Sequence, residues 1–349
     1  MSAPSRRAVL AGLVGAVGLA ACGRPAEAEL LKVTDPSTVP ATPPPSAAPP
    51  PSTSGTPTPS ASAAPATTAP TTTAATTTPP RALPKGVLAG YWPTWIPDAV
   101  RIRDLPAAYG MVHLFAATPA GTDGTLTWAK PGDGRGAATH LREDVAYARA
   151  TQKRAVLLSI GGAGHGLTFG SRAVSTRFVD SVRRIVDAEL GAVDGIDLNT
   201  FEAEQAPNTD EYAWVSRTLK ATYGKNFLVT APPAPWSEID EAFCRDLARA
   251  GLLDLCGPQF YDGPGLTDAA YIADTAAHWA TLVGADRLYI GFGVIANAPN
   301  YLTAAQCATA YKGVAAAVPG VRGAFCWNTS ADEAAGWAFA KTVGPLVSA

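Results

Sequence analysis

Acidic, amide and aromatic side chains recur along this sequence in a pattern that suits sugar chemistry. The segment Asp194–Glu202 reads DGIDLNTFE and contains three carboxylic acids and one amide. A carboxylic acid can transfer protons as a general acid or base, and acids and amides can bind hydroxyl groups. Aromatic residues that follow other short apolar runs can stack on the apolar faces of sugar rings.

The elements that must position these residues are short strands that alternate with helices. Apolar or β-branched runs predict strands at Val87–Trp92, Met111–Ala116, Ala155–Ile160, Gly195–Asn199, Phe227–Thr230, Leu255–Tyr261, Leu288–Phe292 and Gly323–Trp327. Stretches of helical period lie between them, as in Phe178, Val182 and Ile185. This rhythm predicts a closed α/β fold, a (β/α)8 barrel. A doubly wound open sheet is the alternative, but its glycine-rich phosphate turn does not follow the first run.

Function in such a barrel lies at the carboxyl ends of the strands. The strands would bring acids, amides and aromatic rings to that face from several separate segments. The residues expected there are Trp92, Asp194, Asp197, Asn199, Trp236, Gln259, Tyr261, Asp262 and Trp327. Of the nearby histidines, we expect His113 to be an interior residue whose hydrogen bonds are satisfied, and His165 to lie at the rim.

Four motifs in this order resemble those of the family 18 glycoside hydrolases, the chitinase family. Ser159–Gly162 is similar to the S-x-G-G motif of the third strand, and Asp194–Asp197 to the opening of the fourth-strand D-G-x-D-x-D-x-E signature. Gln259–Asp262 resembles the sixth-strand motif of hevamine-like chitinases, and Trp327 stands where the family has a tryptophan on the last strand. The resemblance covers the region from Leu83 onward and implies the same barrel.

The resemblance also implies roles for individual residues. In this family the acetamido oxygen of the substrate is the nucleophile and the last glutamate of the signature is the general acid. Carried over, Glu202 would be the acid, while Asn199, Asp197 and Tyr261 would hold and stabilise the acetamido group. The resemblance and the strand-end positions together imply substrate contacts for Asp194, Gln259, Asp262, Trp327, Trp92 and Trp236.

The sequence departs from the signature at two positions. Asn199 replaces the third carboxylate, and Phe201 stands where the glutamate is expected, with Glu202 one residue later. Because strand side chains alternate between faces, Glu202 would point outward from a regular strand. A β-bulge at Thr200-Phe201 would turn it inward. The bulge favours a hydrolase of chitinase or endo-N-acetylglucosaminidase type, and the regular strand a glycan-binding lectin. A structural wall protein with a degenerate cleft is a third alternative.

The amino-terminal segment predicts export to the cell surface. Arg6 and Arg7 precede an apolar stretch, and Leu19–Cys22 resembles the bacterial lipobox. We expect residues 1–22 to be a lipoprotein signal peptide with lipidation at Cys22, and an ordinary signal peptide is the alternative. Twin-arginine and general secretory export both stay open. The Pro-, Thr-, Ser- and Ala-rich residues 23–82 predict a disordered linker, and 83–349 the barrel.

Composition narrows the set of partners. The formal net charge of −2 and the lack of a basic cluster beyond the extreme amino terminus argue against nucleic acid. No metal-ligand spacing or phosphate loop occurs, so we expect no cofactor, and a monomer whose partner is an N-acetylglucosamine-containing glycan. Four cysteines follow residue 83. Outside the cell they predict the disulfides Cys244–Cys256 and Cys307–Cys326, with buried free thiols as the alternative.

Overall fold

The computed structural model describes residues 83–200 and 206–348. The predictions for the signal peptide, Cys22 and the linker concern residues outside this part of the chain, as do those for Phe201 and Glu202. Within the described residues, no helix has both the length and the apolar character that a bilayer-spanning segment needs.

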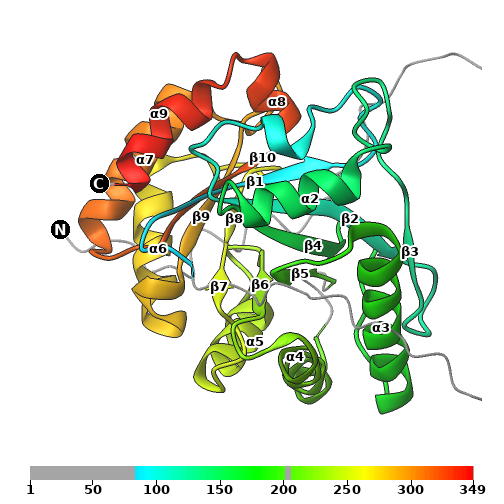
Figure 1. The fold of residues 1–349 in the computed structure, drawn as a ribbon. Helices are drawn as coiled ribbons and strands as arrows, with labels where there is room; N and C mark the ends of the chain where they lie inside the picture. Colours follow the sequence, from blue (N-terminus) through cyan, green and yellow to red (C-terminus); the bar gives the residue numbers. More distant parts are fainter. Residues whose placement is uncertain (1–82, 201–205, 349) are drawn as a thin grey trace, which may run out of the picture. The chain divides into compact units, whose positions relative to one another are not determined.

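Parallel strands form the centre of the domain, with helices around them (Figure 1). The sheet runs in the order β7-β6-β5-β4-β2-β1-β10-β9-β8, with β3 paired antiparallel to β2. The strands are β1 (Val87–Pro93), β2 (Met111–Pro119), β3 (Leu126–Trp128), β4 (Ala155–Gly161), β5 (Gly195–Asn199), β6 (Leu228–Ala231), β7 (Leu255–Cys256), β8 (Gln259–Phe260), β9 (Tyr289–Gly293) and β10 (Gly323–Trp327). All eight predicted runs are confirmed as strands, because β7 and β8 occupy the single run predicted at Leu255–Tyr261.

The two short strands β7 and β8 close the ring. β7 pairs with β6, β8 pairs with β9, and a parallel bridge joins Cys256 to Leu288. Between them, the Gly257 amide donates to the Ala231 carbonyl at 2.9 Å, and the Gly291 amide donates to the Pro258 carbonyl at 3.0 Å. These bonds connect both ends of the sheet through one interrupted strand. The predicted (β/α)8 barrel is therefore confirmed.

The helices follow the strands as a barrel requires, and most begin at a side-chain cap. They are α2 (Leu141–Ala150), α3 (Arg172–Ile185), α4 (Thr209–Tyr223), α5 (Glu238–Arg249), α6 (Ala269–Val283), α7 (Ala304–Ala317), α8 (Thr329–Ala334) and α9 (Ala338–Val347). Ser237 caps α5 by accepting the Asp240 amide, and Thr303 forms a reciprocal capping box with Gln306 at α7.

Strand alternation divides the apolar residues into two cores. On β1, Leu88 and Trp92 belong to the outer core between strands and helices, whereas Val87, Ala89 and Tyr91 belong to the core inside the barrel. The other strands divide in the same way. The inward-facing residues near the carboxyl ends of the strands are therefore the ones whose side chains can form a site inside the barrel.

Two features of the strands near the carboxyl face were not expected from the sequence. β2 extends to Pro119 and forms a hairpin with β3. Its register against β4 shifts between Phe115 and Ala117, so that Phe115 and Ala116 both join the inner core. A register irregularity thus occurs beside the carboxyl face, on β2.

The four cysteines of the domain are buried free thiols, and neither predicted disulfide is formed. All four belong to the outer core, where a free cysteine packs as a small apolar residue. Cys326 Sγ lies 3.1 Å from the Tyr109 hydroxyl rather than on a cysteine partner. Burial raises the pKa of Cys307 to about 12, which keeps this thiol protonated and unreactive.

Candidate functional site

Asp197 is the centre of the candidate site. It is fully buried on the inward face of β5, and hydroxyl groups from three other strands donate to its carboxylate. Tyr91 of β1 donates to Oδ2 at 2.9 Å, Ser159 of β4 donates to Oδ2 at 2.7 Å, and Thr230 of β6 donates to Oδ1 at 2.6 Å. Three donors fix both oxygens, so the carboxylate is held rigidly in one orientation.

Aromatic rings surround this carboxylate on the inner side of the barrel. His113 of β2 stacks on Tyr91 with ring centroids 4.5 Å apart and an interplanar angle of 13°. Burial and, after it, the charge of Asp197 raise the pKa of Tyr91 well above its usual value, so the phenol stays a hydrogen-bond donor. His113 is completely buried, which confirms its predicted interior position, but the expectation that its hydrogen bonds are satisfied is wrong, because neither ring nitrogen has a partner among the described residues.

Asn199 lies two residues beyond Asp197, at the carboxyl end of β5 and on the same strand face. Its backbone carbonyl oxygen accepts a hydrogen bond from the Gly162 amide at 2.7 Å. The preceding Gly161 has a φ of 99°, and a Cβ on it would overlap the Asn199 carbonyl oxygen. The glycine pair of β4 is therefore needed for β4 to approach β5 at the level of Asn199.

Thr200 directly follows the last residue of β5 and is fully buried. Its side chain belongs to the outer side, where its Oγ1 lies 2.5 Å from the hydroxyl of Tyr212 on α4. Leu198 also packs in the outer core, as strand geometry requires for an even-numbered residue here. The bulge at Thr200-Phe201 stays a prediction, because Phe201 and Glu202 lie outside the described residues.

Tyr261 and Gln259 face the site from the interrupted strand. Tyr261 is almost completely buried in the inner core, and its hydroxyl donates to Gln259 Oε1 at 2.5 Å. Gln259 in turn donates through Nε2 to the Pro232 carbonyl at 2.6 Å. The glutamine thereby fixes the direction of the phenol. Asp262 follows with a left-handed φ of 60°, and its side chain is partly buried.

Trp327 forms the floor of the carboxyl end together with other rings. It is 4% exposed, and its ring lies 4.9 Å from that of Phe115, 5.6 Å from that of Tyr91 and 5.9 Å from that of Trp95, between ring centroids. These rings cross Trp327 at angles of 81°, 61° and 43°, so they hold its indole in place by edge-to-face and tilted contacts, and the indole can offer an apolar face to a sugar ring.

Asp194 is not part of this cluster. It precedes β5 at the amino-terminal end of the barrel, where Arg149 pairs with both of its carboxylate oxygens at 3.0 Å. Oδ2 also accepts the Val156 amide at 2.9 Å. The acid is therefore a buried structural anchor, and the prediction that it contacts substrate is wrong because it lies at the opposite end of its strand.

The other two predicted tryptophans differ from one another. Trp92 is fully buried in the outer core and donates to the Val100 carbonyl at 2.8 Å, so its predicted sugar contact is wrong. Strand parity explains this, because Tyr91 takes the inward position. Trp236 follows β6 at the carboxyl end and is 52% exposed, which leaves its ring available to a ligand.

Several site residues were missed by sequence reasoning. Thr230, Phe115, Tyr289 and Phe325 all border the inner cluster. The signal that identifies them is inward parity on strands whose bounds were already predicted, counted from a known inward residue such as Asp197.

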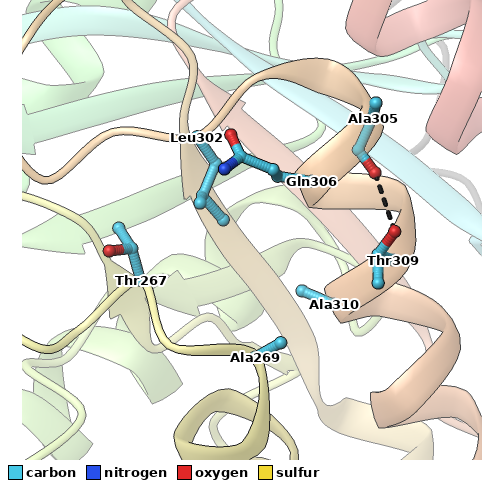
Figure 2. A pocket seen from close by; sticks show the side chains of 7 residues that line it. All are labelled: Thr267, Ala269, Leu302, Ala305, Gln306, Thr309 and Ala310. Atoms are coloured by element: carbon cyan, nitrogen blue, oxygen red, sulfur yellow. Dashed lines mark hydrogen bonds between the residues drawn. The ribbon is translucent and has the colours of Figure 1, made fainter.

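Other parts of the domain are less suited to ligand chemistry. A hollow of about 300 Å³ lies between the start of α6 and α7 (Figure 2). Two of its polar side chains are used internally, because Thr309 donates to the Ala305 carbonyl and Gln306 accepts from Thr303. Among the residues that the structure describes, no three His, Cys, Asp or Glu side chains are arranged to hold a metal ion.

Comparison with known proteins relates this barrel to chitinases. No protein-family model matches the chain. Chitinase Chi52 of Paenibacillus xylanexedens is 26% identical over 161 residues, which are 42% of this chain and 30% of that protein. The chain thus spans about a third of the length of that relative.

Two solved structures match most of the domain. A protein described as a chitinase A of Streptomyces coelicolor superimposes with a TM-score of 0.65 at 22% identity, over 75% of this chain and 98% of that one. A family 18 chitinase of Chromobacterium violaceum does so with a TM-score of 0.64 at 21% identity, over 76% and 84%. The chain therefore has the barrel fold of the family 18 chitinases.

Proposed function

We propose that this chain is an extracellular glycoside hydrolase that cleaves N-acetylglucosamine-containing glycans with the help of the substrate's own acetamido group. The observation that carries the proposal is the rigid carboxylate of Asp197, which three hydroxyl donors hold in place. Asp197 lies two residues before Asn199, on the same face of β5. A fixed negative charge at this depth favours a cationic intermediate formed above it.

The mechanism assigns separate tasks to the remaining residues. Asn199 accepts the acetamido N–H through its side-chain oxygen. The Tyr261 hydroxyl has one proton, which it gives to Gln259 Oε1 in the free protein and turns toward the acetamido oxygen when substrate binds. The acetamido oxygen then attacks the anomeric carbon as Glu202 protonates the leaving oxygen. Water then attacks the anomeric carbon and breaks its bond to the acetamido oxygen, while Glu202 accepts a proton from that water. Trp327 supports the sugar from below.

A pair of substrates that differ only in the acetamido group tests the proposal. We expect the full chain to shorten chitotetraose and to leave cellotetraose intact, because the two share the β-1,4 linkage but cellotetraose lacks the nucleophile. Product oligomers are separated and counted by mass spectrometry over time. Equal cleavage of both substrates, or of neither, contradicts the proposed mechanism.

The second candidate function is a lectin on the same barrel. It is favoured by the outward side chain of Thr200, because unbroken alternation would give the next inward position to Phe201 rather than to Glu202. The barrel would then bind glycans through its aromatic floor without a general acid. The fold itself is compatible with either function.

Loss of Trp327 should weaken glycan binding under both candidate functions. We expect Trp327→Ala to raise the Kd for chitotetraose by about tenfold or more, since a stacking ring contributes ~1.5 kcal/mol. Titration calorimetry on the full chain measures the change, with Trp214→Ala as the control because Trp214 of α4 packs under Arg172 of α3. A Kd that is unchanged in Trp327→Ala excludes this floor as the sugar-binding surface.

A further inference from the structure

His113 lies directly beneath the candidate site, yet neither function above uses it. Both ring nitrogens are buried and have no hydrogen-bond partner among the described residues. Its Nδ1 lies 3.8 Å from Asp197 Oδ2, which is too far for a hydrogen bond and close enough for an ion pair. Two polar atoms left without partners inside a barrel are costly, so this position calls for an explanation.

Among the described residues that surround His113, Asp197 is the one carboxylic acid that acts on its charge. Tyr91 covers one face of the imidazole and Tyr289 lies near the other, with ring centroids 4.5 Å and 6.4 Å away. Burial raises the pKa of both phenols, so both stay neutral. Asp197 and Tyr91 also contact Ser159 from β4, Thr230 from β6 and Phe325 from β10, none of which titrates.

Asp197 is equally isolated from other cations. Within the described residues, the one basic group within 4.0 Å of its carboxylate is His113. In the described part of the chain, the side chains that donate to this carboxylate are the neutral hydroxyl groups of Tyr91, Ser159 and Thr230. Burial lowers the pKa of His113, and Asp197 opposes this effect, so the imidazole is neutral at pH 7.

We propose that His113 is a positioning residue that switches the charge available to the site: neutral, it leaves Asp197 as the anion behind Asn199, and protonated, it pairs with Asp197 and slows hydrolysis. The inference rests on the proposed function for its effect on rate. The link between the two side chains stands on their geometry. A proton taken up from water by Nδ1 would cancel the fixed charge that the cationic intermediate needs.

The effect of Asp197 on the protonation of His113 can be measured in the absence of substrate. The chain has four histidines, so 15N-histidine labelling gives four ring systems to follow by NMR between pH 4 and pH 8, and His113→Asn identifies the signal of His113. Replacing Asp197 by Asn removes the anion that favours imidazolium. We expect Asp197→Asn to lower the pKa of His113 by about one unit. A His113 titration that Asp197→Asn leaves unchanged overturns the proposed pairing.

The effect on rate is tested by the acid limb of the kcat profile on chitotetraose. One pH unit below the pKa of His113, the wild type should retain about a tenth of its plateau kcat. His113→Asn and His113→Gln, two neutral replacements, should extend the plateau to lower pH. The matched control is His278→Asn, since His278 pairs with Glu241 on the outer helices, 3.0 Å away.

The outcomes separate this inference from the proposed function. An acid limb that is the same in the wild type and in whichever His113 variant folds overturns the rate effect of His113, while leaving the hydrolase intact. Absence of hydrolysis at every pH removes the hydrolase proposal. The NMR titration of the imidazole then decides alone whether protonated His113 pairs with Asp197.

Discussion

Glu202→Gln is expected to reduce hydrolysis of chitotetraose by about 10²–10⁴-fold, the usual contribution of a general acid. Glutamine keeps the shape of the side chain and can still form hydrogen bonds, but it has no acidic proton to transfer to the leaving oxygen. Glycan affinity should change little, because the aromatic floor around Trp327 is retained. Initial rates from product separation and Kd values from calorimetry measure the two effects separately.

The chain supplies its own control for this variant. Glu204 is the next acid in the sequence, and Glu204→Gln should leave the rate within a few-fold of the wild type. If the wild type and Glu202→Gln release product at the same background rate, the hydrolase proposal fails. Binding that survives Glu202→Gln but not Trp327→Ala then leaves the lectin as the function.

Asp197→Ala is expected to lower both the free energy of unfolding and the activity. The change leaves three hydroxyl groups, those of Tyr91, Ser159 and Thr230, without the acceptor that they share. Each unsatisfied buried donor costs about 1–3 kcal/mol, and some will find other partners, so a total loss of ~3 kcal/mol is expected. Urea unfolding, followed by circular dichroism, measures it.

Replacement of an exposed aspartate is the control for the stability loss expected in Asp197→Ala. Asp286 lies at the surface beside Arg287, and Asp286→Ala should change the free energy of unfolding by less than about 0.5 kcal/mol. Asp197→Asn keeps the volume and one acceptor oxygen, so it should lose less stability than Asp197→Ala while still losing activity. Equal stability of Asp197→Ala and the wild type would mean that the hydroxyl cluster does not hold this strand.

The architecture was predictable from the sequence because apolar runs and helical periods are local signals. Each of the eight predicted strands is present, and the strand containing Asp197 has the predicted bounds. The break of the sixth barrel strand into β7 and β8 was not predicted, since it follows from closure of the ring at Gly257 and Pro258 rather than from local propensity.

A site residue could be predicted only by two conditions together. It must lie near the carboxyl end of its strand, and its side chain must point into the barrel. Asp197, Asn199 and Tyr261 satisfy both conditions. Asp194 starts its strand at the amino end, and Trp92 is the outward neighbour of Tyr91, so neither reaches the inner site. The state of the cysteines depends on which helix packs on which strand, and no pattern along the chain encodes that.

The stereochemistry of the first product tests the central claim most directly. Proton NMR during the first minutes of chitotetraose cleavage by the full chain distinguishes the two anomers before they interconvert. Attack by the acetamido oxygen followed by water inverts the anomeric carbon twice, so the account predicts that the β anomer appears first. Initial formation of the α anomer, or no product above the rate of Glu202→Gln, would contradict it.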